Sequence, residues 1–287
     1  MFYLVTVKGK DEQLNGKGDR QMSIFSNDAL QHKHVLITGA TGGIGHETAK
    51  RLAAMGARVT VTGRNKEKLE QLKTELLEMA SEDQVFLQQA DLAKPEDRKT
   101  LVAQAEAKFG FINGLVNSAG IGGGNVVEEL DEETLGQVMD LNFKYTFLLT
   151  QAVYRKMLEK KEGDIVNLAS LSGLRGTYGG TAYAASKFAV IGWTQSMALE
   201  AIEHGIRVNA VCPGYVDTEM AWNSIRKRAE AQGVSFEEGM KNAAREIPSG
   251  RLSTPEEVAN TIAFLLTDAA GNIVGESLKI SGGSVMR

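Results

Sequence analysis

Residues 38–45 read TGATGGIG, a run with four glycines that joins a short β-branched segment to a long amphipathic one. Glycine permits a tight turn here, and it lets backbone N–H groups approach a phosphate closely. The N-terminus of a following helix would add a partial positive charge at the same place. An ordinary tight turn uses the same residue type, but the order strand, turn, helix favours a dinucleotide pyrophosphate. The residues expected to contact it are Gly39, Thr41, Gly43, Ile44 and Gly45.

The regular alternation of short β-branched runs and longer amphipathic stretches continues from His34 to the end of the chain. Strands of a parallel sheet are buried on both faces and read as short apolar runs of this kind. The pattern therefore predicts one α/β domain with a doubly wound, seven-stranded parallel sheet and helices on both faces. The expected strands are 34–38, 58–62, 84–89, 114–118, 164–169, 207–212 and 277–281. The expected helices are 43–55, 65–80, 95–109, 131–160, 181–203 and 255–267.

Two segments lie outside this alternation. Residues 1–30 include a polar, glycine-interrupted stretch between Lys8 and Arg20 without helical or strand periodicity, which is typical of a flexible N-terminal extension. A polar helical stretch at about 219–246 separates the sixth strand from the last helix. An insertion of this length in a compact α/β domain is often a lid over a site. We therefore expect a single domain over 31–287 that carries a substrate lid.

The composition excludes several classes of protein. The 287 residues carry a formal net charge of −4, which gives no basic surface for nucleic acid. One cysteine, Cys212, cannot form an internal disulfide and is compatible with a reducing cytoplasm. The four histidines show no metal-ligand spacing with it, and no apolar run approaches the ~18 residues of a membrane span. We expect a cytoplasmic protein with a small-molecule substrate and no metal, nucleic-acid or membrane partner.

The end of the second expected strand bears on the choice of dinucleotide. Residues 61–64 read VTGR, so an arginine, Arg64, stands where a carboxylate would bind the ribose 2′-hydroxyl of NAD. A guanidinium can pair with the 2′-phosphate of NADP through two hydrogen bonds. The alternative is a solvated arginine beside Lys66 and Lys68. The pattern favours NADP(H) over NAD(H).

Four further residues carry the chemistry. Tyr183 and Lys187 are four residues apart and share a helix face, so the ammonium should lower the tyrosine pKa from ~10. Such a tyrosine can give a proton to a carbonyl oxygen or take one from an alcohol. Ser170 follows the fifth strand, where strand ends line the ligand crevice. Asn142 is polar among apolar neighbours and needs a partner, such as a water or a backbone group. Taken singly, these are ordinary surface pairs and caps, but together with the glycine turn they predict a catalytic set.

These motifs resemble those of the short-chain dehydrogenase/reductase family, in its compact form. The resemblance extends from about His34 to Gly283. It is carried by TGATGGIG at 38–45, Asp91-Leu92, the sequence NSAG at 117–120, Asn142, Ser170, Tyr183-x-x-x-Lys187, and Pro213-Gly214 with Thr218. It implies a Rossmann-type fold and usually a homotetramer or homodimer, formed partly through the helices at 131–160 and 181–203.

The resemblance also implies residue roles. Tyr183 would be the general acid/base, Lys187 would lower its pKa and hold the nicotinamide ribose, Ser170 would position the carbonyl, and Asn142 would hold a water in a proton relay. The other cofactor contacts that it implies are Asp91 and Leu92 at the adenine, Asn117, Ala119 and Gly120 along the cofactor, and Pro213, Gly214, Val216 and Thr218 at the nicotinamide end.

The chain departs from the family pattern at two positions. Ser118 replaces a common asparagine, and Gly42 stands where many NADP-dependent members carry a basic residue, so Arg64 is the main argument for NADP(H). The spacing Gly39-x-x-Gly42-x-x-Gly45 also fits a longer, epimerase-like branch, whereas the chain length and the ending ISGG at 280–283 favour the compact branch.

Residues 248–259 and the ending ISGG resemble 3-oxoacyl-thioester reductases. The expected activity is NADP(H)-dependent hydride transfer between the nicotinamide and a carbonyl or secondary alcohol, with a 3-oxoacyl thioester as the favoured substrate. The alternatives are a sugar or other alcohol dehydrogenase, a non-catalytic dinucleotide-binding sensor, and an epimerase or dehydratase that recycles its cofactor.

Overall fold

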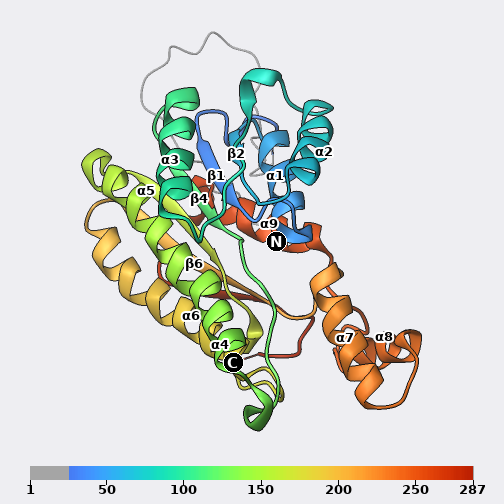
Figure 1. The fold of residues 1–287 in the computed structure, drawn as a ribbon. Helices are drawn as coiled ribbons and strands as arrows, with labels where there is room; N and C mark the ends of the chain where they lie inside the picture. Colours follow the sequence, from blue (N-terminus) through green and yellow to red (C-terminus); the bar gives the residue numbers. More distant parts are fainter. Residues whose placement is uncertain (1–25, 287) are drawn as a thin grey trace, which may run out of the picture.

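The structure is a computed structural model that describes residues 26–286. Seven parallel strands form one sheet in the order β3-β2-β1-β4-β5-β6-β7 (Figure 1). The strands are β1 His34–Thr38, β2 Arg58–Val61, β3 Val85–Leu87, β4 Gly114–Asn117, β5 Gly163–Leu168, β6 Ile206–Pro213 and β7 Ser277–Ile280. The order reverses between β1 and β4, and open α/β sheets bind ligands at such a switch point. The predicted doubly wound sheet is confirmed, with strand bounds within two residues of those expected.

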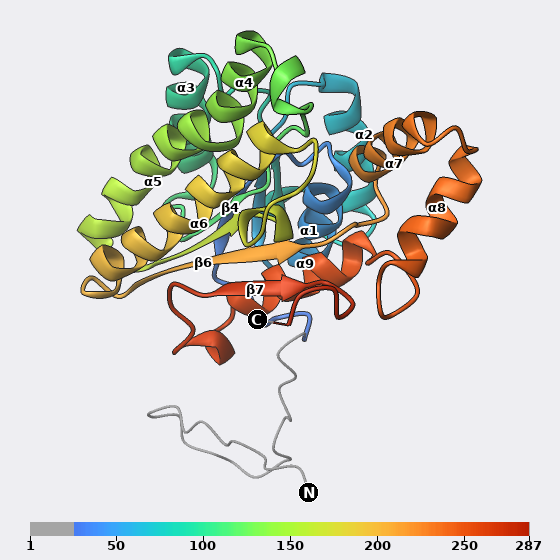
Figure 2. The same cartoon turned by 90° about the horizontal axis from the view of Figure 1, so that it is seen from below.

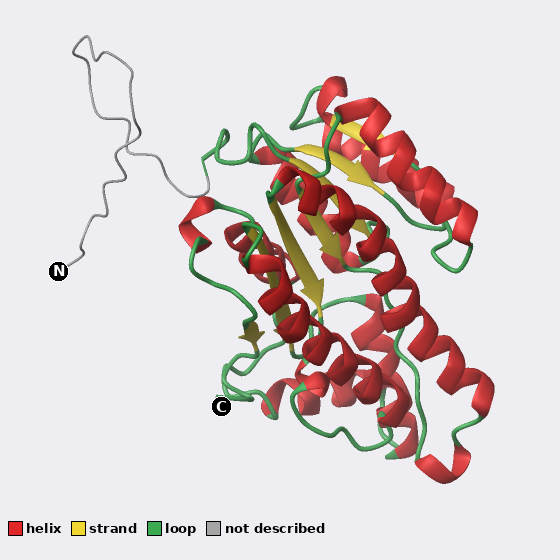
Figure 3. Ribbon diagram, turned by 90° about the vertical axis from the view of Figure 1, so that its left-hand side faces the viewer, coloured by secondary structure: helices red, strands yellow, loops and turns green. Residues whose placement is uncertain are grey.

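Helices cover both faces of the sheet, and Figures 2 and 3 show the strands between them. The helices are α1 Gly43–Ala54, α2 Lys66–Leu77, α3 Pro95–Phe109, α4 Glu132–Met139, α5 Thr146–Lys160, α6 Thr181–Ile202, α7 Glu219–Ala231, α8 Phe236–Arg245 and α9 Pro255–Leu265. Alternate residues of β1 point to opposite faces: Val35 and Ile37 pack with α1, α2 and α9, whereas Leu36 packs with α3, α5 and α6. Two hydrophobic layers therefore hold the sheet in place.

The single helix expected over 131–160 is wrong in one respect. A π-helical turn, Asp140–Tyr145, separates α4 from α5. The wider turn inserts an extra residue, and it lets the Thr146 hydroxyl donate to the Leu141 carbonyl at 3.0 Å. The apolar pattern before and after the turn is helical, so the spacing alone predicts one continuous helix.

The predicted flexible extension, 1–30, lies outside the described residues except for 26–30. These last residues form turns that pack on the domain. Leu30 is buried in the core around α1, and its N–H group donates to the Met55 carbonyl at 2.9 Å. Because the segment is mostly polar, its sequence does not indicate that Leu30 anchors it to the core. The folded domain therefore begins before the expected residue 31.

The segment predicted as a lid forms two helices, α7 and α8, which stand apart from the layers around the sheet (Figure 2). They share a small core that includes Ile225, Ala243 and Ile247. Arg228 and Glu246 join the two helices through a bidentate pair at 2.8 and 2.5 Å. At its base, Val216 forms an isolated parallel bridge with Ser253. The two ends of the segment therefore meet at one place on the body.

Within residues 26–286, no helix is long and apolar enough to cross a membrane. The same residues contain no group of three or more His, Cys, Asp or Glu side chains placed to hold a metal ion.

Candidate active site

The glycine turn lies directly after β1 and begins α1. Gly39 has a φ of +64°, and a Cβ atom there would lie 2.7 Å from the backbone of Ala119. A Cβ atom on Gly43 would lie 2.7 Å from Cγ2 of Thr218. Glycine is therefore required for the close approach of the turn to the segment after β4, and a side chain at Gly43 would collide with the start of the lid.

The N-terminus of α1 is suited to an anion. Among the described residues, no side chain caps the helix at Gly42, and its first turn holds no acidic residue. The first backbone bond within the helix runs from the His46 N–H group to the Gly42 carbonyl at 2.8 Å. The N–H groups of Gly43, Ile44 and Gly45 precede it and have no acceptor inside the helix. These donors, together with the helix dipole, fit the pyrophosphate of a dinucleotide.

The segment after β4 is held against this turn by two hydroxyl contacts. Oγ1 of Thr38 accepts from the N–H groups of Ser118 and Ala119, both at 3.1 Å. The amide nitrogen of Asn117 donates to Thr150 at 2.8 Å, while its Oδ1 is buried and has no partner among the described residues. This orphaned acceptor at the carboxyl end of β4 is a second feature that fits a bound polar ligand.

The opposite end of the cleft lies after β2 and β3. Arg64 is exposed, and no acidic side chain in the described chain pairs with it. A Cβ atom on Gly63 would lie 2.9 Å from the side chain of Thr41, so the two predicted cofactor residues Thr41 and Arg64 flank one glycine. Asp91 is half-buried, and its Oδ1 accepts from the Ala93 N–H group at 3.1 Å, whereas Leu92 is buried.

The predicted acid–base residues meet between β5 and the first turn of α6. Lys187 is buried, and its Nζ donates to the Leu168 carbonyl at 2.7 Å. The same Nζ lies 5.6 Å from the centre of the Tyr183 ring. Oγ of Ser170 accepts from the Ser172 N–H group at 3.1 Å, and Ser170 also hydrogen-bonds the Tyr183 side chain. Ser170, Tyr183 and Lys187 therefore form one cluster, although Ser170 and Lys187 are 17 positions apart in the sequence.

The protonation of this cluster depends on burial. Burial raises the pKa of Tyr183 above its usual value, and the hydrogen bond with Ser170 only partly opposes this. Burial lowers the pKa of Lys187 to about 8. Desolvation is the largest influence on the tyrosine pKa here, and the Lys187 ammonium donates to the Leu168 carbonyl rather than to the phenol oxygen. That Lys187 lowers the tyrosine pKa stays a prediction.

Asn142 lies in the π-helical turn and is buried. Its Oδ1 accepts from the Ile121 N–H group at 2.8 Å, and its Nδ2 donates to the Ile121 carbonyl at 2.9 Å. The predicted backbone partner is therefore confirmed. π-turns occur often at functional sites, and this one aims a polar side chain at the strand-end segment that contains Gly120.

The predicted residues after β6 lead from the sheet into the lid. Pro213 ends β6, and the Gly214 N–H group donates to Ile280 of β7 at 2.9 Å. Val216 is buried, and Thr218 precedes α7. Thr218 lies against Gly43, so the structure brings the start of the lid to the glycine turn.

Three residues near the site are not among those predicted from the sequence. Met220 of α7 faces Gly122, where a Cβ atom would lie 3.6 Å from its Cγ. Thr38 holds the segment after β4, and Ser186 lies under the first turn of α6. Thr38 and Ser186 stand inside the quoted motifs and could have been suspected for that reason, whereas Met220 depends on how the lid folds.

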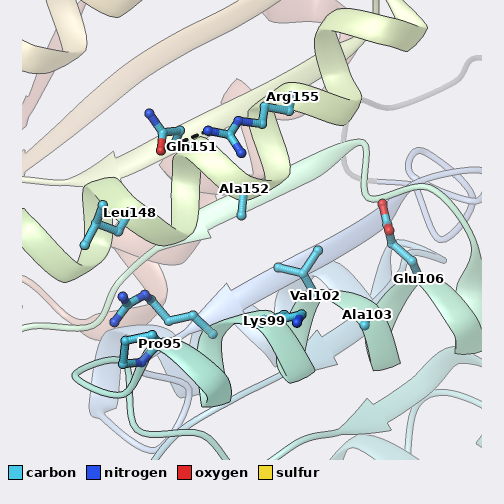
Figure 4. Close-up of a pocket in the computed structure, with 10 residues that line it drawn as sticks. Pro95, Lys99, Val102, Ala103, Glu106, Leu148, Gln151, Ala152 and Arg155 are labelled. Atoms are coloured by element: carbon cyan, nitrogen blue, oxygen red, sulfur yellow. Dashed lines mark hydrogen bonds between the residues drawn. The ribbon is translucent and has the colours of Figure 1, made fainter.

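A groove with a volume of about 360 Å³ lies elsewhere, between α3 and α5 (Figure 4). Its walls include Lys99, Val102 and Glu106 of α3 and Leu148 and Arg155 of α5. None of the predicted site residues lines it, so it is distinct from the strand-end cleft.

The fold and the cleft define a dinucleotide-binding class of α/β proteins, and comparison with known proteins identifies the family. The model of the short chain dehydrogenases matches residues 33–229. The chain belongs to the short-chain dehydrogenase/reductase family, and it is an oxidoreductase.

Two relatives illustrate the similarity in sequence. The chain is 38% identical over 250 residues to the granaticin polyketide synthase putative ketoacyl reductase 1 of Streptomyces violaceoruber, which covers 86% of this chain and 91% of the relative. It is 34% identical over 257 residues to a 3-oxoacyl-[acyl-carrier-protein] reductase of Rickettsia felis, and the match covers 90% of this chain and 98% of the relative.

Two solved structures share the fold. A variant of actinorhodin polyketide ketoreductase with NADPH has a TM-score of 0.84 at 37% identity, covering 88% of this chain and 97% of the other. Levodione reductase has a TM-score of 0.84 at 34% identity, covering 88% and 98%.

Proposed function

We propose that the protein is an NADP(H)-dependent reductase of 3-oxoacyl thioesters, exchanging a hydride between the nicotinamide and a carbonyl or secondary alcohol. The observation that carries the proposal is the segment after β4, which lies between the two parts of the site: Ala119 lies against Gly39 of the glycine turn, and Gly120 lies against Asn142 and Lys187. This cleft offers an anion site and a proton donor at the same edge of the sheet.

The residues predicted to hold the cofactor follow the cleft from end to end. Arg64, Asp91 and Leu92 lie toward the adenosine end, and Gly39, Thr41, Gly43, Ile44 and Gly45 lie at the phosphates. The segment with Asn117, Ala119 and Gly120 would run along the cofactor. The nicotinamide end would contact Tyr183, Lys187, Pro213, Gly214, Val216 and Thr218. When bound, the nicotinamide supplies or accepts the hydride.

The proton chemistry belongs to this chain's own side chains. Oγ of Ser170 accepts from the Ser172 N–H group, and its hydroxyl, which bonds the Tyr183 side chain in this structure, would turn to donate to a substrate carbonyl oxygen. The raised pKa of Tyr183 keeps its hydroxyl protonated at neutral pH, as a proton donor in the reducing direction requires. Lys187 in its charged form stabilises the phenolate that remains after the transfer.

The choice of NADP(H) is supported by Arg64, which is exposed at the end of β2 without an acidic partner in the described chain. It is also supported by the solved ketoreductase with NADPH. A guanidinium in this position can bind the 2′-phosphate, and nothing in residues 61–64 supplies the carboxylate that favours NAD(H).

The substrate class is supported by the named ketoacyl reductases among the relatives. The lid adds a physical reason, since its first turns expose Met220 and Trp222, with 45% and 39% of their surfaces accessible. Apolar side chains of this size suit an acyl chain better than a sugar, whose hydroxyl groups need hydrogen-bond partners. A cyclic ketone is the second candidate, because levodione reductase has the same fold at 34% identity.

Assembly into a homodimer or homotetramer is also proposed. The outer faces of α5 and α6 expose large apolar side chains, among them Leu148, Phe188, Leu199 and Ile202. Exposed apolar surface of this kind marks a protein interface. The buried, unpaired Cys212 agrees with the predicted cytoplasmic location.

The test is nucleotide absorbance with purified protein and acetoacetyl-CoA, with NADPH and NADH in parallel. Fast loss of NADPH is expected, and Tyr183→Phe should reduce kcat by on the order of 10²–10⁴-fold because the proton donor is gone. Preference for NADH would contradict the role of Arg64. Turnover of a cyclic ketone but not of the thioester would overturn the substrate assignment while leaving the reaction class intact.

A further inference from the structure

Ser186 precedes Lys187 in α6, and its side chain is completely buried. Its hydroxyl donates to the carbonyl of Tyr183 at 2.7 Å. The same oxygen accepts from Nδ2 of Asn142 at 3.0 Å. Ser186 therefore connects two of the four proposed active-site residues, although it does not face the cleft itself.

The direction of these hydrogen bonds is fixed by chemistry. A carbonyl oxygen can only accept a hydrogen bond, so the Ser186 hydroxyl must donate its one proton to the Tyr183 carbonyl. Its lone pairs then face Asn142, which must present its amide nitrogen. Two bonds with the Ile121 backbone require the same direction: the Asn142 Oδ1 accepts from the Ile121 N–H group at 2.8 Å, and Nδ2 donates its other hydrogen to the Ile121 carbonyl at 2.9 Å. One directed chain of bonds thus runs from the backbone of Tyr183 to the segment after β4.

The same side-chain arrangement occurs two turns further along α6. There, Nδ2 of Asn167 donates to Oγ1 of Thr194 at 2.9 Å, and Thr194 donates to the carbonyl of Val190 at 2.8 Å. This second bridge shows that a threonine hydroxyl is also able to link a buried asparagine to this helix.

The orientation of the Asn142 amide matters because Lys187 is near it. A Cβ atom on Gly120 would lie 3.1 Å from Oδ1 of Asn142 and 3.7 Å from Nζ of Lys187. The amide and the ammonium therefore flank the same glycine. A change in the direction of the amide dipole would alter the electrostatic environment of Lys187 and, through it, that of Tyr183.

We propose that Ser186 is a positioning residue for the reaction: it accepts the second amide hydrogen of Asn142, secures the amide direction that the Ile121 backbone also sets, and holds the π-turn against the first turn of α6. The proposal rests on the reductase function proposed above. Without the Ser186 hydroxyl, one amide hydrogen of Asn142 is buried without an acceptor, and the amide and the π-turn must shift to satisfy it.

The first experiment compares Ser186→Ala with the wild type. The expected result is a roughly tenfold lower kcat with KM values for NADPH and substrate changed by less than about twofold. The pH dependence of kcat should also shift by about half a pH unit, because the environment of Lys187 changes. The matched control is Ser196→Ala in the same helix, whose exposed hydroxyl donates to the Gly192 carbonyl at 3.0 Å.

Ser186→Thr keeps the donor and acceptor of the hydroxyl and should restore most of kcat and the wild-type pH profile. In an Asn142→Ala background, Ser186→Ala should cause no further loss, because the residue that it positions is absent.

A purely structural role would lower the melting temperature of Ser186→Ala while kcat and its pH profile stayed at wild-type values, and this result would overturn the proposal. The proposal would also be overturned if the loss of kcat in the double variant, Asn142→Ala with Ser186→Ala, equalled the product of the two single losses. If the wild type itself turned over no carbonyl compound, both the proposed function and this inference would fail, whereas an active wild type with an unaffected Ser186→Ala contradicts the inference alone.

Discussion

Arg64 is the single residue on which the choice between NADPH and NADH is expected to depend. It is exposed at the strand-end edge of the sheet, and no described acidic side chain neutralises it. Because charge-assisted hydrogen bonds are strong, Arg64→Ala should raise the KM for NADPH by about 10- to 100-fold and leave the KM for NADH unchanged. Initial rates with both nucleotides measure this. Lys73→Ala, further along α2, is the control, and an equal change for both nucleotides would contradict the assignment.

His34 gives a residue-scale prediction about acid stability. It is buried, its Nδ1 faces the Gly110 carbonyl at 3.0 Å, and its Nε2 faces Oγ1 of Thr60 at 2.8 Å. A carbonyl only accepts, so Nδ1 carries the proton of a neutral ring. Burial lowers the pKa of His34 from 6.5. The unfolded chain therefore binds a proton at a higher pH than the folded chain, and the stability contributed by this neutral ring is lost as the pH falls below about 6.5.

Urea unfolding at pH 8 and pH 5 tests this effect. The wild type should lose more free energy of unfolding between these two pH values than His34→Gln does. His204→Gln removes an exposed ring and should behave as the wild type. An identical pH dependence for all three proteins would show that the buried ring does not titrate in this range.

At the scale of elements, the sequence could predict the strands because each is a short apolar run between glycine or polar turns. It could not predict the π-turn at Asp140–Tyr145, since one extra residue barely changes the apolar spacing on either side. The break between the two lid helices, in contrast, is marked in the sequence: Gly233 has a positive φ, and Ser235 caps α8 by accepting from the Glu238 N–H group. The position of Asn142 follows from the unseen π-turn.

The base of the lid is held by the C-terminal segment after β7. Gly282 has a φ of +55°, and a Cβ atom there would lie 2.3 Å from Oγ of Ser249 and 2.7 Å from Cγ2 of Ile247. Gly282→Val should therefore displace the lid base, raising the KM for the carbonyl substrate about tenfold and changing that for NADPH less. Steady-state kinetics measure both constants.

The control for this substitution is Gly250→Ala. Gly250 also has a positive φ, of +74°, but a Cβ atom there would meet nothing within 4 Å. It therefore shares the backbone strain without the collision. If both variants changed the KM for substrate equally, backbone strain alone would explain the change. The collision with Ser249 and Ile247 would then contribute nothing to the KM.

At the scale of the whole molecule, the exposed apolar residues of α5 and α6 predict association of copies. Leu199 is 74% exposed, although it lies on a helix whose other face is buried in the core. Leu199→Glu should shift the protein to a smaller species, because a carboxylate at an apolar interface must be desolvated. Size-exclusion chromatography with light scattering measures the mass. Met79→Glu, at an exposed apolar residue just after α2, should leave the mass unchanged, and a wild-type monomer would contradict the proposed assembly.

The overall architecture and most of the candidate site could be predicted because they depend on strand ends, which the sequence marks clearly. Ser170 and Asn117 follow or end strands, so their meeting at one edge is a consequence of parallel topology. The acid–base balance could not be predicted in the same way. Desolvation of Tyr183 and Lys187 depends on packing around the first turn of α6, and it raises the pKa of the tyrosine and lowers that of the lysine to about 8.

The lid has a core of its own, and its two ends meet at the bridge between Val216 and Ser253. A segment that leaves and rejoins a fold at one point can change in length or sequence without disturbing the strands beneath it. We therefore expect substrate range to diverge through substitutions in α7 and α8 while the proposed dinucleotide site stays the same. For engineering, the bridge marks natural junctions for exchanging this module between relatives, and such chimeras should inherit their cofactor preference from the body and their substrate preference from the transplanted helices.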